Sequence, residues 1–150
     1  MIIKYPIEID GLGVVLFMGR SGCFYSKKIK KLLEKNSKKF YYFESNKIFE
    51  KIDKKYLKLN YDYIFCFRSF HILKNNILKK VNKAAINFHP GPPEYRGTGC
   101  VNYALYENSK FYGCTAHLIN EKVDNGKIID VKKFNINKKD NISEVLTKTY

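Results

Sequence analysis

Three side chains that could do chemistry together lie near the ends of apolar, strand-like runs in this chain. They are the amide of Asn87, the imidazole of His89 and the carboxylate of Asp124. An amide can donate a hydrogen bond to a developing oxyanion, and an imidazole titrates near neutral pH, as a general base for an amine must. A carboxylate can orient that imidazole. These residue types are the ones that acyl transfer to an amine requires.

The surrounding sequence favours a site but also allows structural roles. Asn87 and His89 have the same parity on a predicted strand, so both side chains can point into one cleft. The loop after His89 contains three prolines, which stiffen it, and Gly91, which permits unusual backbone angles. Asp124 precedes the turn dipeptide Asn125-Gly126 and also fits a plain hairpin turn. A strand-ending asparagine and a packed histidine are the corresponding alternatives for the other two positions.

Strand-like and helix-like segments alternate along the chain, which predicts an α/β fold with a mostly parallel sheet and helices on both faces. The predicted strands are 13–18, 40–43, 63–67 and 84–88, followed by a C-terminal antiparallel hairpin of 111–119 and 127–136. Helical spacing predicts helices capped by Ser26 and by Ser45 or Asn46, a helix between Ile72 and Val81, one over 98–108, and one starting at Ser143. Loops at strand ends are where open α/β sheets keep their chemistry.

Charge and size narrow the classes of function. The formal net charge is +14, yet only three of the 28 basic residues are arginines, namely Arg20, Arg68 and Arg96. Because the lysines fall mainly in helix-like stretches, we expect solvated basic faces and no nucleic-acid partner. A basic RNA-binding domain is the alternative that the charge leaves open. The 150 residues fit one domain.

Because the sequence shows no recognisable targeting signal and no close cysteine pair, we expect a cytoplasmic location. No apolar run approaches the roughly 18 residues of a membrane span, and residues 1–9 do not resemble a signal peptide, so no membrane partner is expected. The four cysteines lack the close spacing of a metal or redox motif, and we expect them to be reduced, with no metal bound. They are Cys23, Cys66, Cys100 and Cys114.

The order Asn-x-His, a Pro/Gly-rich loop, Tyr-Arg-Gly, a helix, Gly-x-Thr-x-His and Asp-x-Gly resembles the formyltransferases that use 10-formyltetrahydrofolate. The segment NFHPGPPEYRGTG is most similar to the nucleotide-sugar N-formyltransferase branch. The glycinamide ribonucleotide and methionyl-tRNA branches more often have Ser and Leu at the positions of Gly91 and Pro92. The likeness runs from about Tyr63 to Ile136 and implies a Rossmann-like formyltransferase fold.

The resemblance implies roles for individual residues. It places Asn87, His89 and Asp124 in a catalytic triad beside a cleft for folate. The residues expected in that cleft are Arg68, Ser69, Phe70, Ile72, Leu73, Val123 and Gly126. The acceptor substrate is expected to contact Tyr95, Asn102 and Tyr103, which lie close to the motif. Arg96 could pair with a diphosphate, although an ion pair within the fold is an equal alternative.

The resemblance further implies an N-formyltransferase that moves a formyl group from 10-formyltetrahydrofolate to a nucleotide-linked amino sugar. The acceptor would be a dTDP- or GDP-linked 3- or 4-amino-deoxy sugar, and the product would feed lipopolysaccharide O-antigen assembly. We expect one catalytic domain over 1–150 without a C-terminal domain, acting as a monomer or weak homodimer. Glycinamide ribonucleotide formylation and a catalytically idle folate-binding module are the alternatives.

Overall fold

The computed structural model describes residues 11–48 and 50–150. The N-terminal segment 1–10, to which the signal-peptide prediction applies, and Phe49 of the second predicted helix lie outside the described residues.

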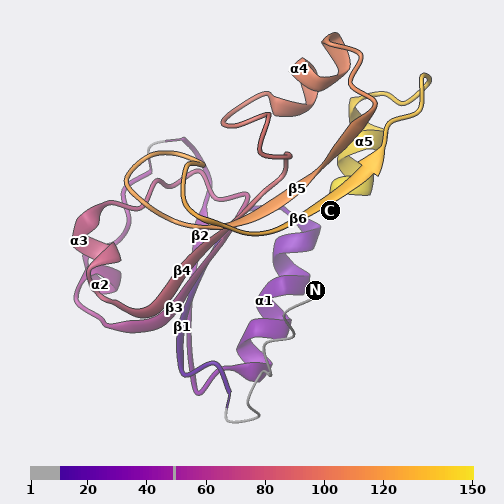
Figure 1. The fold of residues 1–150 in the computed structure, drawn as a ribbon. Coiled ribbons are helices and arrows are strands. Elements are labelled where there is room, and N and C mark those ends of the chain that lie inside the picture. The colour runs from indigo at the N-terminus through magenta and orange to yellow at the C-terminus, as the bar shows by residue number, and fades with distance from the viewer. Residues whose placement is uncertain (1–10, 49) are drawn as a thin grey trace.

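Six strands form one sheet in the order β2-β1-β3-β4-β5-β6 (Figure 1). The four parallel strands are β1 (Val14–Arg20), β2 (Lys39–Ser45), β3 (Tyr61–Phe67) and β4 (Val81–His89). The hairpin of β5 (Phe111–Leu118) and β6 (Ile128–Asn135) completes the sheet, with β5 antiparallel to β4. The predicted α/β fold and its C-terminal hairpin are therefore confirmed.

Helices cover both faces of the parallel strands. They are α1 (Phe24–Asn36), α2 (Lys54–Leu57), α3 (Asn75–Leu78), α4 (Cys100–Tyr106) and α5 (Ile142–Thr149). In Figure 1, α1 lies on one side of the parallel strands and α2 and α3 lie on the other. Alternate side chains of β1 point to opposite faces of the sheet. Phe17 packs in the cluster with α1, while Leu16 and Met18 pack with Ile77 of α3. Burial on both faces explains why the central strand β1 is apolar over most of its length.

The prediction of the second helix is wrong: it placed the start too early and made the helix too long. Ser45 ends β2, and its buried hydroxyl donates to the carbonyl of Gly19 at 2.9 Å, so it is bound to the sheet and does not cap a helix. Among the described residues of this segment, only Lys54–Leu57 is helical, capped by Asp53. The apolar residues of this segment still pack on the core, because burial of side chains does not require a continuous helix.

Other helix boundaries also differ from those predicted. Cys23, and not Ser26, is the N-cap of α1; Ser26 is buried in the first turn and accepts a hydrogen bond from the Arg20 amide. The helix predicted between Ile72 and Val81 shrinks to Asn75–Leu78, because Val81 already belongs to β4. The last helix starts one residue before Ser143 and has a capping box formed by Asn141 and Glu144.

Candidate active site

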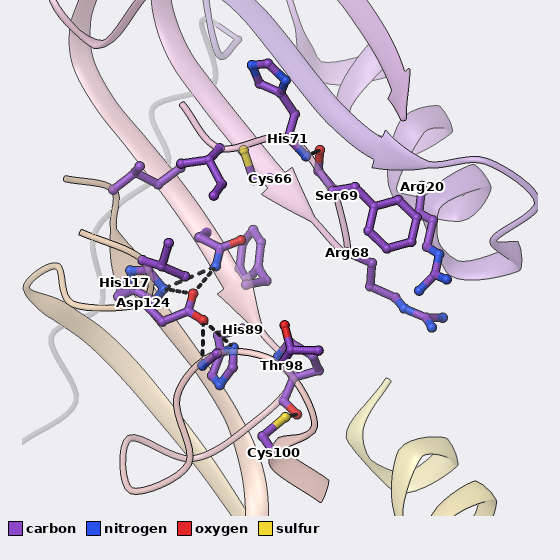
Figure 2. Close-up of a pocket in the computed structure, with 18 of the residues that line it drawn as sticks. Arg20, Cys66, Arg68, Ser69, His71, His89, Thr98, Cys100, His117 and Asp124 are labelled. Carbon is purple, nitrogen blue, oxygen red and sulfur yellow. Dashed lines mark hydrogen bonds and ion pairs between the residues drawn. The ribbon is translucent and has the colours of Figure 1, made fainter. Parts of the chain in front are cut away.

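A cleft of about 540 Å³ opens at the carboxyl ends of β3 and β4 (Figure 2). Asn87 and His89 line it from β4, as their shared parity predicts, and Asp124 reaches it from the loop between β5 and β6. Its size lies within the range of small-molecule sites. The structure thus brings together all three predicted catalytic residues.

Asp124 is the shared hydrogen-bond acceptor of the site. Its Oδ1 accepts from the Asn87 amide nitrogen at 3.0 Å, and its Oδ2 accepts from the Gly97 backbone amide at 3.1 Å. The Nδ1 atom of His89 lies 3.2 Å from Oδ2. Asp124 has a φ of 48°, a left-handed conformation that aspartate tolerates better than most residues. The contacts with Asn87 and His89 hold the carboxylate toward β4.

His89 is held at both ring nitrogens. The ring is 4 % exposed, and Nε2 lies 2.7 Å from the carbonyl oxygen of Tyr95. A carbonyl only accepts, so Nε2 must carry a hydrogen there, while Nδ1 faces the Asp124 carboxylate. In this arrangement His89 donates a hydrogen bond through Nε2. To act as the general base expected from the sequence, Nε2 would first have to leave the Tyr95 carbonyl and lose its hydrogen.

His117 of β5 belongs to the same cluster. It pairs with Asn87 in the sheet register, and its Nε2 lies 3.3 Å from Asp124 Oδ1. The hydrogen bond with Asp124 raises the pKa of His117 despite its burial. This residue was not among the predicted site residues, although the Gly-x-Thr-x-His motif contained it.

Burial by itself would raise the pKa of Asp124, but its partners outweigh that effect. The hydrogen bond with His117, the charge of His89 and the Gly97 amide together hold the pKa of Asp124 below its usual value. Each of these partners stabilises the ionised carboxylate. The site therefore keeps a negative charge beside two histidines.

The loop after His89 is fixed by buried side chains. The carbonyl of Pro90 accepts from the Tyr112 hydroxyl at 2.7 Å, and that of Gly91 accepts from the Thr115 hydroxyl at 2.8 Å. Gly91 has a steric role: a Cβ there would lie 2.6 Å from His89 Nε2 and 2.8 Å from the Tyr95 oxygen. A side chain at this position would disturb the His89 contact.

Most of the residues expected to bind folate line one wall of the cleft. They are Arg68, Ser69, Phe70, Ile72, Leu73 and Val123. Gly126 does not line it; its Cα faces the Leu118 carbonyl so closely that a Cβ would overlap that oxygen. Rings and aliphatic chains on this wall suit a flat heterocycle. The residues present therefore fit a folate.

The expected acceptor residues lie outside this cleft. Tyr95, Arg96 and Tyr103 line a separate pocket of about 320 Å³, and Asn102 is exposed and lines neither pocket. The Tyr95 hydroxyl donates to Glu107, and Arg96 donates to Asn125 and to the Pro93 carbonyl. Arg96 thus ties the 90–97 loop to the loop that carries Asp124.

The described residues offer neither a metal-binding cluster nor a membrane-spanning helix. Within residues 11–48 and 50–150, no three His, Cys, Asp or Glu side chains gather in a way that could hold a metal ion. None of the helices in that same part of the chain has the length and apolar character needed to cross a membrane.

The sheet and the site at its carboxyl edge define a Rossmann-like α/β protein. Residues 18–150 match the model of the family described as Formyl transferase, and the chain belongs to that family. The resemblance seen in the sequence motifs is thereby confirmed.

Curated relatives are matched over part of their length. Formyltetrahydrofolate deformylase 2 (mitochondrial) of Arabidopsis thaliana is 30% identical over 102 residues, covering 66% of this chain and 31% of that protein. Methionyl-tRNA formyltransferase of Listeria innocua is 37% identical over 78 residues, covering 51% and 25%. The matched region therefore spans less than a third of either relative.

Three solved structures share the fold. A 4-N formyltransferase from Francisella tularensis superposes with a TM-score of 0.73 at 22% identity, over 91% of this chain and 62% of that chain. The N-formyltransferase from Helicobacter canadensis, in complex with folinic acid and dTDP-3-aminofucose, gives 0.72 at 18% over 89% and 57%. Phosphoribosylglycinamide formyltransferase from Campylobacter jejuni gives 0.59 at 19% over 91% and 87%.

Proposed function

We propose that this protein transfers a formyl group from 10-formyltetrahydrofolate to the amine of a nucleotide-linked amino sugar. One observation carries the proposal: Asn87, His89 and Asp124 meet in a cleft whose opposite wall is the 68–73 segment. A donor, an imidazole and an ionised carboxylate beside room for a flat cofactor are the parts that acyl transfer to an amine needs.

Each of the three residues would have its own role in the transfer. The Asn87 amide would donate to the oxyanion that forms when the amine attacks the formyl carbon, joined by the Nε2–H of His89 once its bond to the Tyr95 carbonyl opens. Asp124 would hold His89 in orientation and stabilise positive charge that develops nearby. The oxyanion then collapses, the bond between the formyl carbon and N10 of the folate breaks, and N10 takes up the proton that the amine loses. Asp124 or His89 would carry that proton, the latter after its bond to the Tyr95 carbonyl opens and Nε2 no longer holds its hydrogen.

The choice of a sugar acceptor has its own support. The structures from Francisella and Helicobacter superpose with TM-scores of 0.73 and 0.72, against 0.59 and 0.65 for two phosphoribosylglycinamide formyltransferases. The Helicobacter protein was solved with dTDP-3-aminofucose, which sets the acceptor class we propose. In this proposal the enzyme is a monomer or weak homodimer that works in the cytoplasm and supplies surface polysaccharide assembly.

Hydrolysis is a second candidate, because one curated relative is a formyltetrahydrofolate deformylase. Water would then take the place of the amine at the same cleft. The products separate the two reactions, since hydrolysis releases formate and transfer yields a formamide on the acceptor.

The test is an assay with 10-formyltetrahydrofolate and a panel of dTDP-, UDP- and GDP-linked 3-amino and 4-amino sugars, with glycinamide ribonucleotide and a no-acceptor sample alongside. We expect a formylated sugar, detected by mass, and its loss in His89→Gln. Release of formate in the sample without acceptor would show that the reaction is hydrolysis. A formylated product from glycinamide ribonucleotide alone would show that this molecule, and not an amino sugar, is the acceptor. His89→Gln at wild-type rates would reject the assigned site.

A further inference from the structure

Two of the three arginines of this lysine-rich chain line the candidate active-site cleft. The Arg20 guanidinium lies 4.1 Å from the centroid of the Phe70 ring, and that of Arg68 lies 4.5 Å from the Tyr150 ring. Both rings also line the cleft. Stacking on a ring fixes the plane of a guanidinium and orders its donors.

Within residues 11–48 and 50–150, neither guanidinium is paired with a carboxylate, since no carboxylate oxygen lies within 4.0 Å of either one. The Arg68 side chain donates to the Cys23 sulfur at 3.6 Å, a weak acceptor. Both arginines are half-buried, and partly desolvated cations are costly without a counter-ion. The arrangement is therefore suited to an anion supplied by a ligand.

The sheet order places these arginines next to the reacting groups. Arg20 ends β1, Arg68 follows β3, and β1 and β3 are neighbouring parallel strands. Asn87 and His89 belong to β4, the next strand along the same edge. Figure 2 shows Arg20 and Arg68 together on the side of the pocket away from Asp124 and His89. A single ligand that spans the cleft would thus contact the two guanidinium groups at one end and the predicted catalytic residues at the other.

We propose that Arg20 and Arg68 form an anion subsite that binds the diphosphate of the nucleotide-linked acceptor. The inference rests on the proposed function and identifies the part of the cleft that recognises the nucleotide. It reassigns Arg68, which the resemblance placed among the folate-binding residues, to the diphosphate of the acceptor. Two planar forks with five donors each match the adjacent oxygens of a diphosphate. Arg96, expected from sequence to take this role, is engaged by Asn125 and Pro93.

Direct binding tests the subsite without turnover. Isothermal titration with dTDP, UDP and GDP, none carrying a sugar, should give binding to the wild-type protein. Arg20→Gln and Arg68→Gln should each weaken it by about tenfold to a hundredfold, since each loses charge-assisted hydrogen bonds. Arg→Lys variants should recover only part of the loss, because lysine keeps the charge and lacks the fork.

Two controls distinguish this subsite from a general effect of positive charge and from damage to the folate wall. The pair Lys31→Gln and Lys35→Gln, on the exposed face of α1, removes the same charge as both arginine changes and should leave dTDP binding within about twofold. Folinic acid binding reports on the folate wall. Absence of nucleotide binding in the wild type, equal losses in the lysine variant, or a loss confined to folinic acid would each overturn the subsite. Nucleotide binding that depends on the arginines, without sugar formylation, would leave the subsite standing and reject the proposed reaction.

Discussion

At the scale of single residues, the site is organised by one carboxylate. Asp124 contacts Asn87, His89, His117 and the Gly97 amide, so its charge is shared among donors from three parts of the chain. Because each donor also limits how the others move, changes at one position are expected to affect the whole cluster.

Asn87→Ala should lower kcat by roughly a hundredfold or more with little change in KM, because an oxyanion donor acts only in the transition state. The control is Asn82→Ala, an exposed position on the same strand. Steady-state kinetics of the formyl transfer measure both. A loss confined to KM would assign Asn87 to substrate binding.

The pair of His117 and Asp124 should make stability depend on pH. The pKa of His117 is raised above its usual 6.5, so its contribution is complete below about pH 6.5 and is lost as pH rises through the raised value. The pKa of Asp124 is lowered, so its contribution is present above its usual 3.8 and is lost on acidification through the lower value.

Melting temperatures of the wild type and His117→Gln, from about pH 5 to about pH 9, should therefore converge as pH rises. NMR titration of the His117 ring checks the raised pKa directly, and Asp124→Asn should lower it. A difference between the two proteins that widens with pH would show that the pair does not act in this way.

At the scale of elements, the end of β4 and two loops carry the reacting groups, and buried side chains hold the loops in place. Tyr112 and Thr115 of β5 bond the carbonyls of Pro90 and Gly91, and Arg96 joins the same loop to Asn125. The buried cluster of Cys100, Val101, Ala104, Tyr112 and Val145 packs α4 and α5 against β5 beneath this loop. The position of His89 thus depends on packing from elements that follow it in the chain.

Gly91→Ala should lower kcat by roughly a hundredfold, because the added Cβ must displace the His89 ring or the Tyr95 carbonyl. Glu94→Ala in the same loop is the matched control. It loses only an exposed ion pair with Lys133, worth under about 1 kcal/mol. Equal activity of Gly91→Ala and the wild type would mean that the His89 contact with Tyr95 has no part in catalysis.

At the scale of the whole molecule, the central strands support the cleft. Ile64 of β3 is fully buried and pairs in register with Leu16 of β1 and Ala85 of β4. The cleft residues Arg68 to Leu73 follow this strand directly. Stability of the core and geometry of the site are therefore connected through β3.

Ile64→Ala should reduce the free energy of unfolding by roughly 2–5 kcal/mol, through lost burial and the cavity it leaves. Ile128→Ala on β6, where the side chain is 44 % exposed, should change it by less than about 0.5 kcal/mol. Urea denaturation of both variants gives the comparison. Similar losses in the two would contradict the placement of Ile64 at the centre of the core.

The sequence by itself determined the features that depend on local spacing. Alternating apolar segments predicted the strands and their hairpin, and shared parity on β4 predicted that Asn87 and His89 would face one cleft. Apolar spacing overestimated two helices, because it reports which side chains are buried and does not report whether the backbone stays helical between them. Only the tertiary structure decided which distant residues meet. It brought Asp124 and His117 to Asn87, placed Arg20 beside Arg68, and engaged Arg96 elsewhere. Those contacts follow from strand order and loop paths, which no local pattern encodes.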